Sequence, residues 1–298
     1  MQRFARPDRQ ILTGQERELE VHRGYRIIQV ELIDDAPQAA TNAGIVLDYY
    51  RPDGAGRQVI LLLPMAGGAY SLERHFARHF ARRGFAVVIA ERRHFPQPKE
   101  LEAIVPWVEQ SIRDNLRALD WIAKRPELDT NCIALLGISL GGLRGVMLTA
   151  LDGRIKAAAL GLVGGDLPYI VAYTREPGVA RQRAEYMSAH QLTLSQFEQR
   201  FRQIFPWDPD ALAEHIDRKK VLMVLALCDR VVPARKGWEL RARLGKPQTV
   251  LLPTGHYSAV LAVPYIEAAC LRFFRERLRL ESPVKQPTRV CSPRDASR

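Results

Sequence analysis

The stretch IALLGISLGGLRG, residues 133–145, decides how the rest of the chain is interpreted. A run of apolar residues ends at Gly137, and a single serine, Ser139, follows between Gly137 and Gly141. Such a run is typical of a strand buried on both faces of a parallel sheet, and the residues after the serine predict a helix. Ser139 therefore lies at a strand-to-helix turn, at the carboxyl end of a strand, where ligands bind in open α/β sheets.

Apolar runs and helical patterns alternate along most of the chain. Strands are predicted at 25–33, 44–52, 58–64, 85–90, 132–138, 155–163, 220–227 and 247–253. Helices are predicted at 71–84, from 106 onward, and at 140–151, 233–245 and about 258–280. This order predicts the α/β class, with a mostly parallel twisted sheet and helices on both faces.

The alternation breaks once, between about residues 166 and 209, in a segment rich in aromatic side chains. Its pieces 180–190 and 193–205 have helical patterns. We therefore expect one α/β domain over residues 1–281, in which 167–209 forms a small helical cap over the carboxyl edge of the sheet. An ordinary long crossover is the alternative. Residues 282–298, with three prolines and little apolar content, are expected to be a disordered basic tail.

Composition excludes several classes of protein. The chain of 298 residues has no apolar run long enough to cross a membrane and no apolar segment near its start that would act as a secretory signal. Its four cysteines form no CxxC pair, and its histidines and cysteines lack zinc-ligand spacing, so we expect no metal and no cofactor. Thiols placed in apolar runs fit a reduced, cytoplasmic setting.

The formal net charge is +11, which raises the question of an anionic partner. Residues 272–298 contain eight Lys and Arg against three acids, so much of the excess lies in the last helix and the tail. No motif combines aromatic and basic residues, so nucleic-acid binding is not expected. Integral membrane association is not expected either. Weak peripheral contact of the basic tail with anionic lipid stays open.

A reactive serine needs a base, and the base needs an acid that orients it. Asp229 comes just after the predicted strand 220–227, and His256 comes just after the strand 247–253. Parallel strands end at the same edge of a sheet, so both side chains are expected beside Ser139. The order Ser, Asp, His is also the order in which hydrolases of this architecture carry a catalytic triad.

Other interpretations of these residues stay open. Ser139 could N-cap the helix that follows it, and Asp229 could do the same for its own helix. Asp166 also follows a predicted strand and is the alternative acid. His190 and His215 lie in or near the predicted insert and are poorer candidates for the base.

A tetrahedral intermediate also needs backbone N–H groups that stabilise its oxyanion. One would come from Leu140, the residue after the serine. The second would come from the loop PMAGG, residues 64–68, which follows the strand 58–64. Ala66 and its neighbour Met65 are the candidates there.

Taken together, these segments resemble the α/β-hydrolase superfamily. The resemblance is carried by GISLGG (137–142), DRVVP (229–233), GHYS (255–258) and PMAGG (64–68), and it covers about residues 45–280. The segment 208–233 looks like the dienelactone-hydrolase-like and prolyl-oligopeptidase-like branches. Many members have His-Gly where this chain has Pro64-Met65, a departure that affects only which amide serves as donor.

The resemblance implies Ser139 as nucleophile, His256 as general base and acid, Asp229 as its orienter, and the amides of Leu140 and Ala66 or Met65 as oxyanion donors. The expected activity is that of a serine hydrolase, which cleaves a small or medium carboxylic ester through an acyl-enzyme. Its partner would be a small-molecule acyl substrate. An amidase, peptidase or thioesterase with the same triad and a non-catalytic binding protein of the same fold are the alternatives. The oligomeric state is left open.

Overall fold

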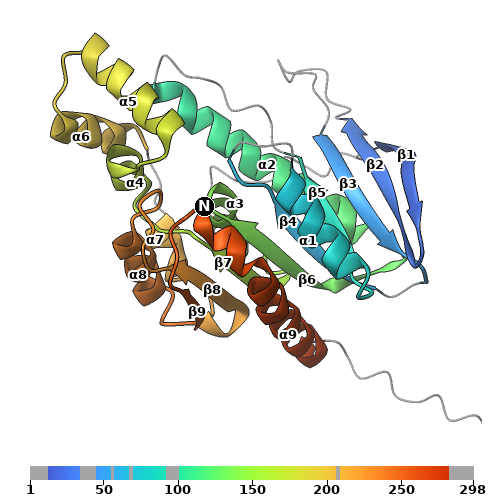
Figure 1. Ribbon diagram of the computed structural model, residues 1–298. Coiled ribbons are helices and arrows are strands. Elements are labelled where there is room, and N and C mark those ends of the chain that lie inside the picture. The colour runs from blue at the N-terminus through green and yellow to red at the C-terminus, as the bar shows by residue number, and fades with distance from the viewer. Residues whose placement is uncertain are drawn as a thin grey trace, which may run out of the picture.

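The computed structural model describes residues 13–33, 45–54, 57–66, 70–91, 101–205 and 209–281. Within these ranges, nine strands form one sheet in the order β1-β2-β3-β5-β4-β6-β7-β8-β9 (Figure 1). The strands are β1 (Thr13–His22), β2 (Tyr25–Ile33), β3 (Ile45–Pro52), β4 (Arg57–Leu63), β5 (Ala86–Ala90), β6 (Leu128–Ile138), β7 (Ile155–Gly161), β8 (Val221–Ala226) and β9 (Gln248–Leu252). From β5 to β9 all neighbours are parallel, whereas β1, β2 and β3 are antiparallel to their neighbours.

Helices cover both faces of this sheet. The α-helices are α1 (Ser71–Ala81), α2 (Ile104–Ala123), α3 (Leu140–Leu151), α4 (Leu167–Tyr173), α5 (Pro177–Ala189), α6 (Leu194–Ile204), α7 (Pro209–Ala213), α8 (Ala234–Arg243) and α9 (Val263–Glu281). Short 3₁₀ turns are η2 (Leu101–Ala103), η3 (Arg218–Lys220) and η4 (Ser258–Ala262). Helices α1 and α9 pack on one face, and α2, α3 and α8 pack on the other. The predicted α/β fold class is confirmed.

The central strand β4 explains why the predicted strands read as unbroken apolar runs. Its side chains alternate between the two faces of the sheet, and each face is covered by helices. Leu61 and Leu63 belong to the core under α2 and α3, whereas Ile60 and Leu62 belong to the core under α1 and α9. All four are at most 2% exposed.

The helical period predicted for 71–84 is also confirmed. Phe76 and Phe80 of α1 are buried and stack on each other, and Phe80 meets Phe274 of α9 with 5.8 Å between the ring centroids. Phe273, also buried, packs beside Phe274. Burying an aromatic side chain of this size contributes about 1.5–3 kcal/mol, so this cluster fixes both helices to the sheet.

The strand β1 was not predicted from the sequence. Its residues TGQERELEVH carry four charged side chains, and the strand pairs with β2 alone at the edge of the sheet. Charged residues are common on edge strands because they prevent pairing with other chains. No apolar run marks such a strand in the sequence, so β1 is recognised as a strand only from its pairing with β2 in the structure.

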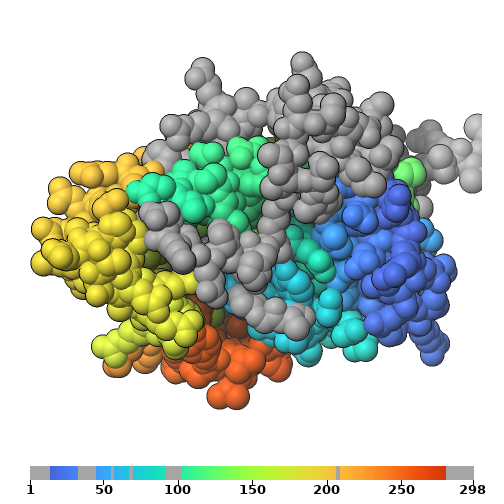
Figure 2. Space-filling view, turned by 90° about the horizontal axis from the view of Figure 1, so that it is seen from above, coloured from blue at the N-terminus to red at the C-terminus, as the bar shows by residue number. Residues whose placement is uncertain are grey.

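Among the described residues between β7 and β8, three α-helices lie in the segment where a helical insert was predicted, and a fourth follows it. Helices α4, α5 and α6 occupy residues 167–204, here termed the helical insert, and α7 begins at Pro209. The helical insert and the antiparallel strands β1–β3 form opposite ends of the molecule (Figure 2). No helix in the described part of the chain has both the length and the apolarity to cross a membrane. The proposed tail, 282–298, lies outside the described residues.

Candidate active site

The turn between β6 and α3 holds Ser139 in an unusual backbone conformation, with φ 56° and ψ −121°. A Cβ atom at Gly137 would lie 2.3 Å from the Gly141 carbonyl oxygen, and one at Gly141 would lie 2.2 Å from the Leu63 carbonyl oxygen. Only glycine fits at these two positions because the obstructing atoms are backbone. The two glycines around the serine therefore allow a strained turn that presents its hydroxyl at the sheet edge.

Ser139 does not act as a helix cap. A capping residue usually has an extended backbone, and its side chain accepts a hydrogen bond from the second or third helical N–H. Ser139 has a positive φ, and its side chain makes no capping bond to α3. Its Oγ lies instead 3.1 Å from Nε2 of His256. The capping interpretation of Ser139 is wrong.

His256 follows β9 and lies between Ser139 and Asp229. Its Nδ1 is 2.7 Å from Oδ2 of Asp229, and the side chains of the two residues are 10% and 3% exposed. With its proton on Nδ1, the ring donates to Asp229, and Nε2 accepts from the Ser139 hydroxyl. This arrangement leaves Nε2 able to take the serine proton.

Asp229 is itself held in place from several sides. Its Oδ1 accepts hydrogen bonds from the N–H groups of Val231 and Val232, both at 2.9 Å, so that Oδ2 is directed to the histidine. These bonds organise the turn that leads into α8. The loops after β8 and β9 are joined by a 2.9 Å bond from the Cys228 N–H to the Thr254 carbonyl, which holds the acid and the histidine in register.

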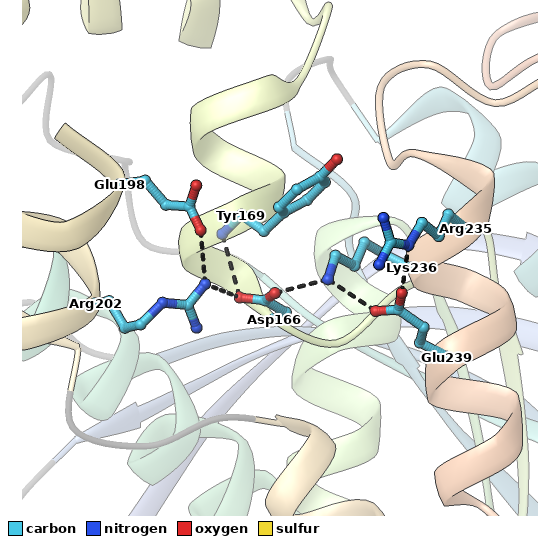
Figure 3. A network of polar contacts seen from close by, with 7 residues as sticks. All are labelled: Asp166, Tyr169, Glu198, Arg202, Arg235, Lys236 and Glu239. Atoms are coloured by element: carbon cyan, nitrogen blue, oxygen red, sulfur yellow. Dashed lines mark hydrogen bonds and ion pairs between the residues drawn. The ribbon is translucent and has the colours of Figure 1, made fainter. Parts of the chain in front are cut away.

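Asp166, the alternative acid, is engaged elsewhere. It stands at the start of α4, where Oδ2 lies 2.7 Å from Nζ of Lys236, and Oδ1 lies 2.8 Å from a guanidinium nitrogen of Arg202 (Figure 3). Partial burial opposes ionisation, but these two cations hold the pKa of Asp166 below its usual range. The carboxylate that contacts His256 is that of Asp229.

The contacts of Asp166 form part of a wider network that sequence reasoning missed. Arg202 also pairs with Glu198 of α6, and Lys236 also pairs with Glu239 of α8. Asp166 therefore joins the helical insert to a helix of the main domain (Figure 3). The pairs Glu198–Arg202 and Lys236–Glu239 have helical spacing in the sequence. Their convergence on Asp166 is not visible there, because the residues come from three separate segments.

The predicted oxyanion donors come from the start of α3 and from the loop after β4. Leu140 is the first residue of α3, and the N–H groups of a first helical turn have no acceptor within the helix. The Met65 N–H is already used, since it donates to Oε1 of Glu73 at 2.8 Å. The exposed Ala66 donates no backbone hydrogen bond to any residue in the described ranges. Gly67 and Gly68 of the same loop lie outside those ranges.

The remaining histidine candidates do not join this site. His190 is exposed and lies tilted against Tyr186, with 4.2 Å between the ring centroids, and His215 is exposed next to α7. Among the described residues, no three His, Cys, Asp or Glu side chains are grouped in a way that could hold a metal ion. The groups that the structure brings together at this edge of the sheet are a serine, an imidazole and a carboxylate.

Comparison with known proteins identifies the fold. No protein family model and no curated protein matches the chain. Among solved structures, an acetyl xylan esterase from a Paenibacillus species superposes with a TM-score of 0.69 at 21% identity, covering 90% of each chain. An acetyl xylan esterase from a Thermoanaerobacterium species gives 0.62 at 15% identity, with 87% of this chain and 88% of that one covered.

An alpha/beta hydrolase from a Penicillium species gives a TM-score of 0.59 at 15% identity, covering 90% of this chain and all of that one. At such identities, the likeness concerns the fold alone. The chain has the α/β-hydrolase fold over nearly its whole length, as the sequence resemblance implied.

Proposed function

We propose that this protein is a serine hydrolase that cleaves a small or medium carboxylic ester through an acyl-enzyme. The observation that carries the proposal is the hydrogen-bonded series Ser139, His256 and Asp229, with separations of 3.1 and 2.7 Å, on a serine held in a strained turn. A serine that served only packing would need neither a histidine at its hydroxyl nor a buried carboxylate behind that histidine.

In the acylation step, Ser139 Oγ attacks the acyl carbon while Nε2 of His256 takes the hydroxyl proton. The imidazolium that forms is stabilised by Asp229, which stays ionised and keeps the ring oriented. The negative charge on the former carbonyl oxygen is stabilised by the N–H groups of Leu140 and Ala66. When the intermediate collapses, the carbon–oxygen bond to the leaving group breaks, and His256 returns its proton to the departing alkoxide.

Deacylation repeats these steps with water as the nucleophile. His256 takes a proton from the water as its oxygen attacks the acyl carbon, and the same two amides hold the second oxyanion. Collapse of this intermediate breaks the bond to Ser139 Oγ, which recovers its proton from His256 and releases the carboxylic acid.

The helical insert is proposed as a cap over this site. It starts at Leu167, just after the N-cap Asp166, and the short loop 162–165 connects it to β7 at the edge of the sheet that also carries Ser139. Its aromatic side chains Phe197 and Phe201 are buried in the main core and hold the insert in place, whereas Tyr173 is 39% exposed and accessible to a ligand. The names of the two esterase neighbours indicate ester substrates for those proteins, which favours an ester here over an amide or a thioester.

The setting and partners of the protein are proposals as well. A cytoplasmic location agrees with free thiols at Cys132 and Cys270, both buried. The substrate would be a small acyl compound. Contact of the basic tail with anionic lipid can be measured by liposome binding at low salt with and without residues 282–298.

The test of the proposed function is hydrolysis of p-nitrophenyl esters of increasing acyl length by wild type and Ser139→Ala. We expect kcat to fall by about 10⁴–10⁶ in the variant, as for loss of a triad nucleophile. The optimal chain length then measures the acyl pocket. Equal activity of the two proteins would refute the site assignment.

Labelling with a fluorophosphonate separates the remaining alternatives. A wild type that is labelled at Ser139 but cleaves no ester would point to an amidase, peptidase or thioesterase. A wild type that is neither labelled nor active would favour the non-catalytic binding protein.

A further inference from the structure

A single peptide group after β4 is held from both of its ends. The Pro64 carbonyl accepts a hydrogen bond from Nη2 of Arg144, and the Met65 N–H donates to Oε1 of Glu73 at 2.8 Å. This carbonyl and this N–H belong to the same peptide bond between Pro64 and Met65. A peptide group is planar, so two bonds at opposite ends fix its orientation.

The two side chains that hold this peptide group are buried and of opposite charge. Arg144 is 1% exposed and comes from α3, and Glu73 is 5% exposed and comes from α1. These helices lie on opposite faces of the sheet, so the peptide group at the end of β4 is held between the two layers. Burying charged groups costs free energy unless their hydrogen bonds are made, and well-packed apolar residues usually serve stability as well or better.

Glu73 lines a small cavity whose other lining residues are all apolar. They are Leu62, Leu63, Met65, Phe76, Leu136 and Ile138. A carboxylate in such surroundings forms a strong hydrogen bond with an N–H group, because little water competes for it. The Glu73–Met65 bond is therefore a rigid contact.

Arg144 is also anchored, and it links the loop to the helix that carries the nucleophile. Its Nη1 donates to Oγ of Ser111 on α2 at 3.0 Å, and Ser111 is 4% exposed. One turn earlier on α3, Gly141 lies in direct contact with the Leu63 carbonyl. The first turns of α3 and the loop after β4 are thus held together as one unit.

We infer that Glu73 and Arg144 are positioning residues that set the direction of the Ala66 N–H toward the oxyanion. This inference rests on the proposed function. Between the fixed peptide group and the Ala66 N–H, only the backbone dihedrals of Met65 remain free. Holding the preceding peptide group in place orients the next donor before substrate arrives, and an oxyanion donor is effective because it needs no reorganisation in the transition state.

The experiment compares Glu73→Leu, which removes the acceptor, with Glu73→Gln, which keeps an oxygen that can accept the Met65 N–H. We expect Glu73→Leu to lower kcat by about 10²–10³ with KM little changed, the loss typical of one oxyanion donor. Affinity for an alkylboronic acid, which forms a tetrahedral adduct on the serine, should fall by a similar factor. Glu73→Gln should recover most of the kcat that Glu73→Leu loses.

Two further variants keep the experiment decisive. Glu267→Leu removes another buried carboxylate, 6% exposed on α9, and reports the general effect of such a change, so its kcat per labelled serine should match wild type. Arg144→Met removes the bond to the Pro64 carbonyl and should show the same fall in kcat and boronate affinity at constant KM. It serves as the test if Glu73→Leu does not fold.

The outcomes divide clearly when rates are normalised to serine labelled by fluorophosphonate. A selective fall in kcat and boronate affinity with rescue by Gln supports the inference. Provided that wild type is active, three results would overturn the inference. The first is a kcat of Glu73→Leu equal to that of wild type, and the second is a fall in kcat as large in Glu73→Gln as in Glu73→Leu. The third is a fall in the kcat of Glu73→Leu with unchanged boronate affinity. A wild type without Ser139-dependent hydrolysis would overturn the proposed function and this inference with it.

Discussion

Replacing Gly141 by alanine tests the contact between the nucleophile helix and the strand β4. The added Cβ would lie 2.2 Å from the Leu63 carbonyl oxygen and 3.1 Å from that of Pro64, and Cβ contacts under 3.0 Å essentially never occur. Both oxygens are backbone atoms and cannot rotate away. The start of α3 and the end of β4 must therefore move apart.

Two magnitudes follow from this contact. Alanine favours a helix over glycine by about 1 kcal/mol and overpacking costs about 1–3 kcal/mol, so the net destabilisation is up to about 2 kcal/mol. A displacement on the order of 1 Å between reacting groups typically costs about 10²-fold in rate. Because Ser139 and Leu140 lie on one side of this contact and Ala66 on the other, we expect kcat/KM of Gly141→Ala to fall by about that factor.

The assay is ester hydrolysis per fluorophosphonate-labelled serine, with the melting temperature measured in parallel. Gly153→Ala is the matched control, since a Cβ there meets no atom within 4 Å, and it should keep the activity and Tm of wild type. Gly141→Ala should lose up to about 2 kcal/mol of stability, which lowers Tm by up to roughly 8 °C. If its kcat/KM equals that of the control, the two segments do not need this close approach, and the reasoning fails.

Three further changes follow from the geometry. Asp229→Asn should lower kcat by about 10³–10⁴ while the far-ultraviolet spectrum is unchanged. The Asn oxygen keeps the bonds from Val231 and Val232, so its NH2 group donates to Nδ1 of His256 and holds the ring in the tautomer that cannot accept the serine proton; a variant with wild-type kcat would contradict the role of this acid. Asp166→Asn should lower Tm relative to wild type at neutral pH. That difference should shrink as pH falls below about 4, since a carboxylate with a lowered pKa stabilises the folded state above its usual pKa and loses this effect on protonation; a difference independent of pH would exclude the ion pairs. In the native protein a thiol reagent should modify the exposed Cys228 and leave Cys270 unmodified, because burial raises the pKa of the Cys270 thiol to about 12, and mass spectrometry of both sites decides it.

Much of the fold can be predicted from the sequence because helices cover both faces of the sheet. Each central strand is then an unbroken apolar run, and the crossover helices carry one apolar face. This criterion fails for β1, because its charged residues are typical of an edge strand but also of a surface loop. Here the pairing with β2, which is non-local information, decides the structure.

The donor amide shows a similar limit. The sequence placed Met65 and Ala66 together as candidates, and a contact with Glu73 eight residues away distinguishes them. Glu73 lies among other charged residues of α1, so no pattern marks it as buried. Arg144 is the single charged residue of the largely apolar helix α3, but its partners lie in other elements that the sequence does not indicate. Their role depends on the approach of two helices from opposite faces of the sheet.

The sequence by itself determined the α/β class, the glycine-flanked turn at Ser139 and the placement of Asp166, Asp229 and His256 after strands. These follow from local rules, because an apolar run, a glycine at a crowded turn and a loop after a strand each act over a few residues. Only the tertiary structure decided which carboxylate contacts His256. Asp166 and Asp229 both follow strands, but the packing of α6 and α8 pairs Asp166 with Arg202 and Lys236, and hydrogen-bonded loops after β8 and β9 bring Asp229 to the histidine.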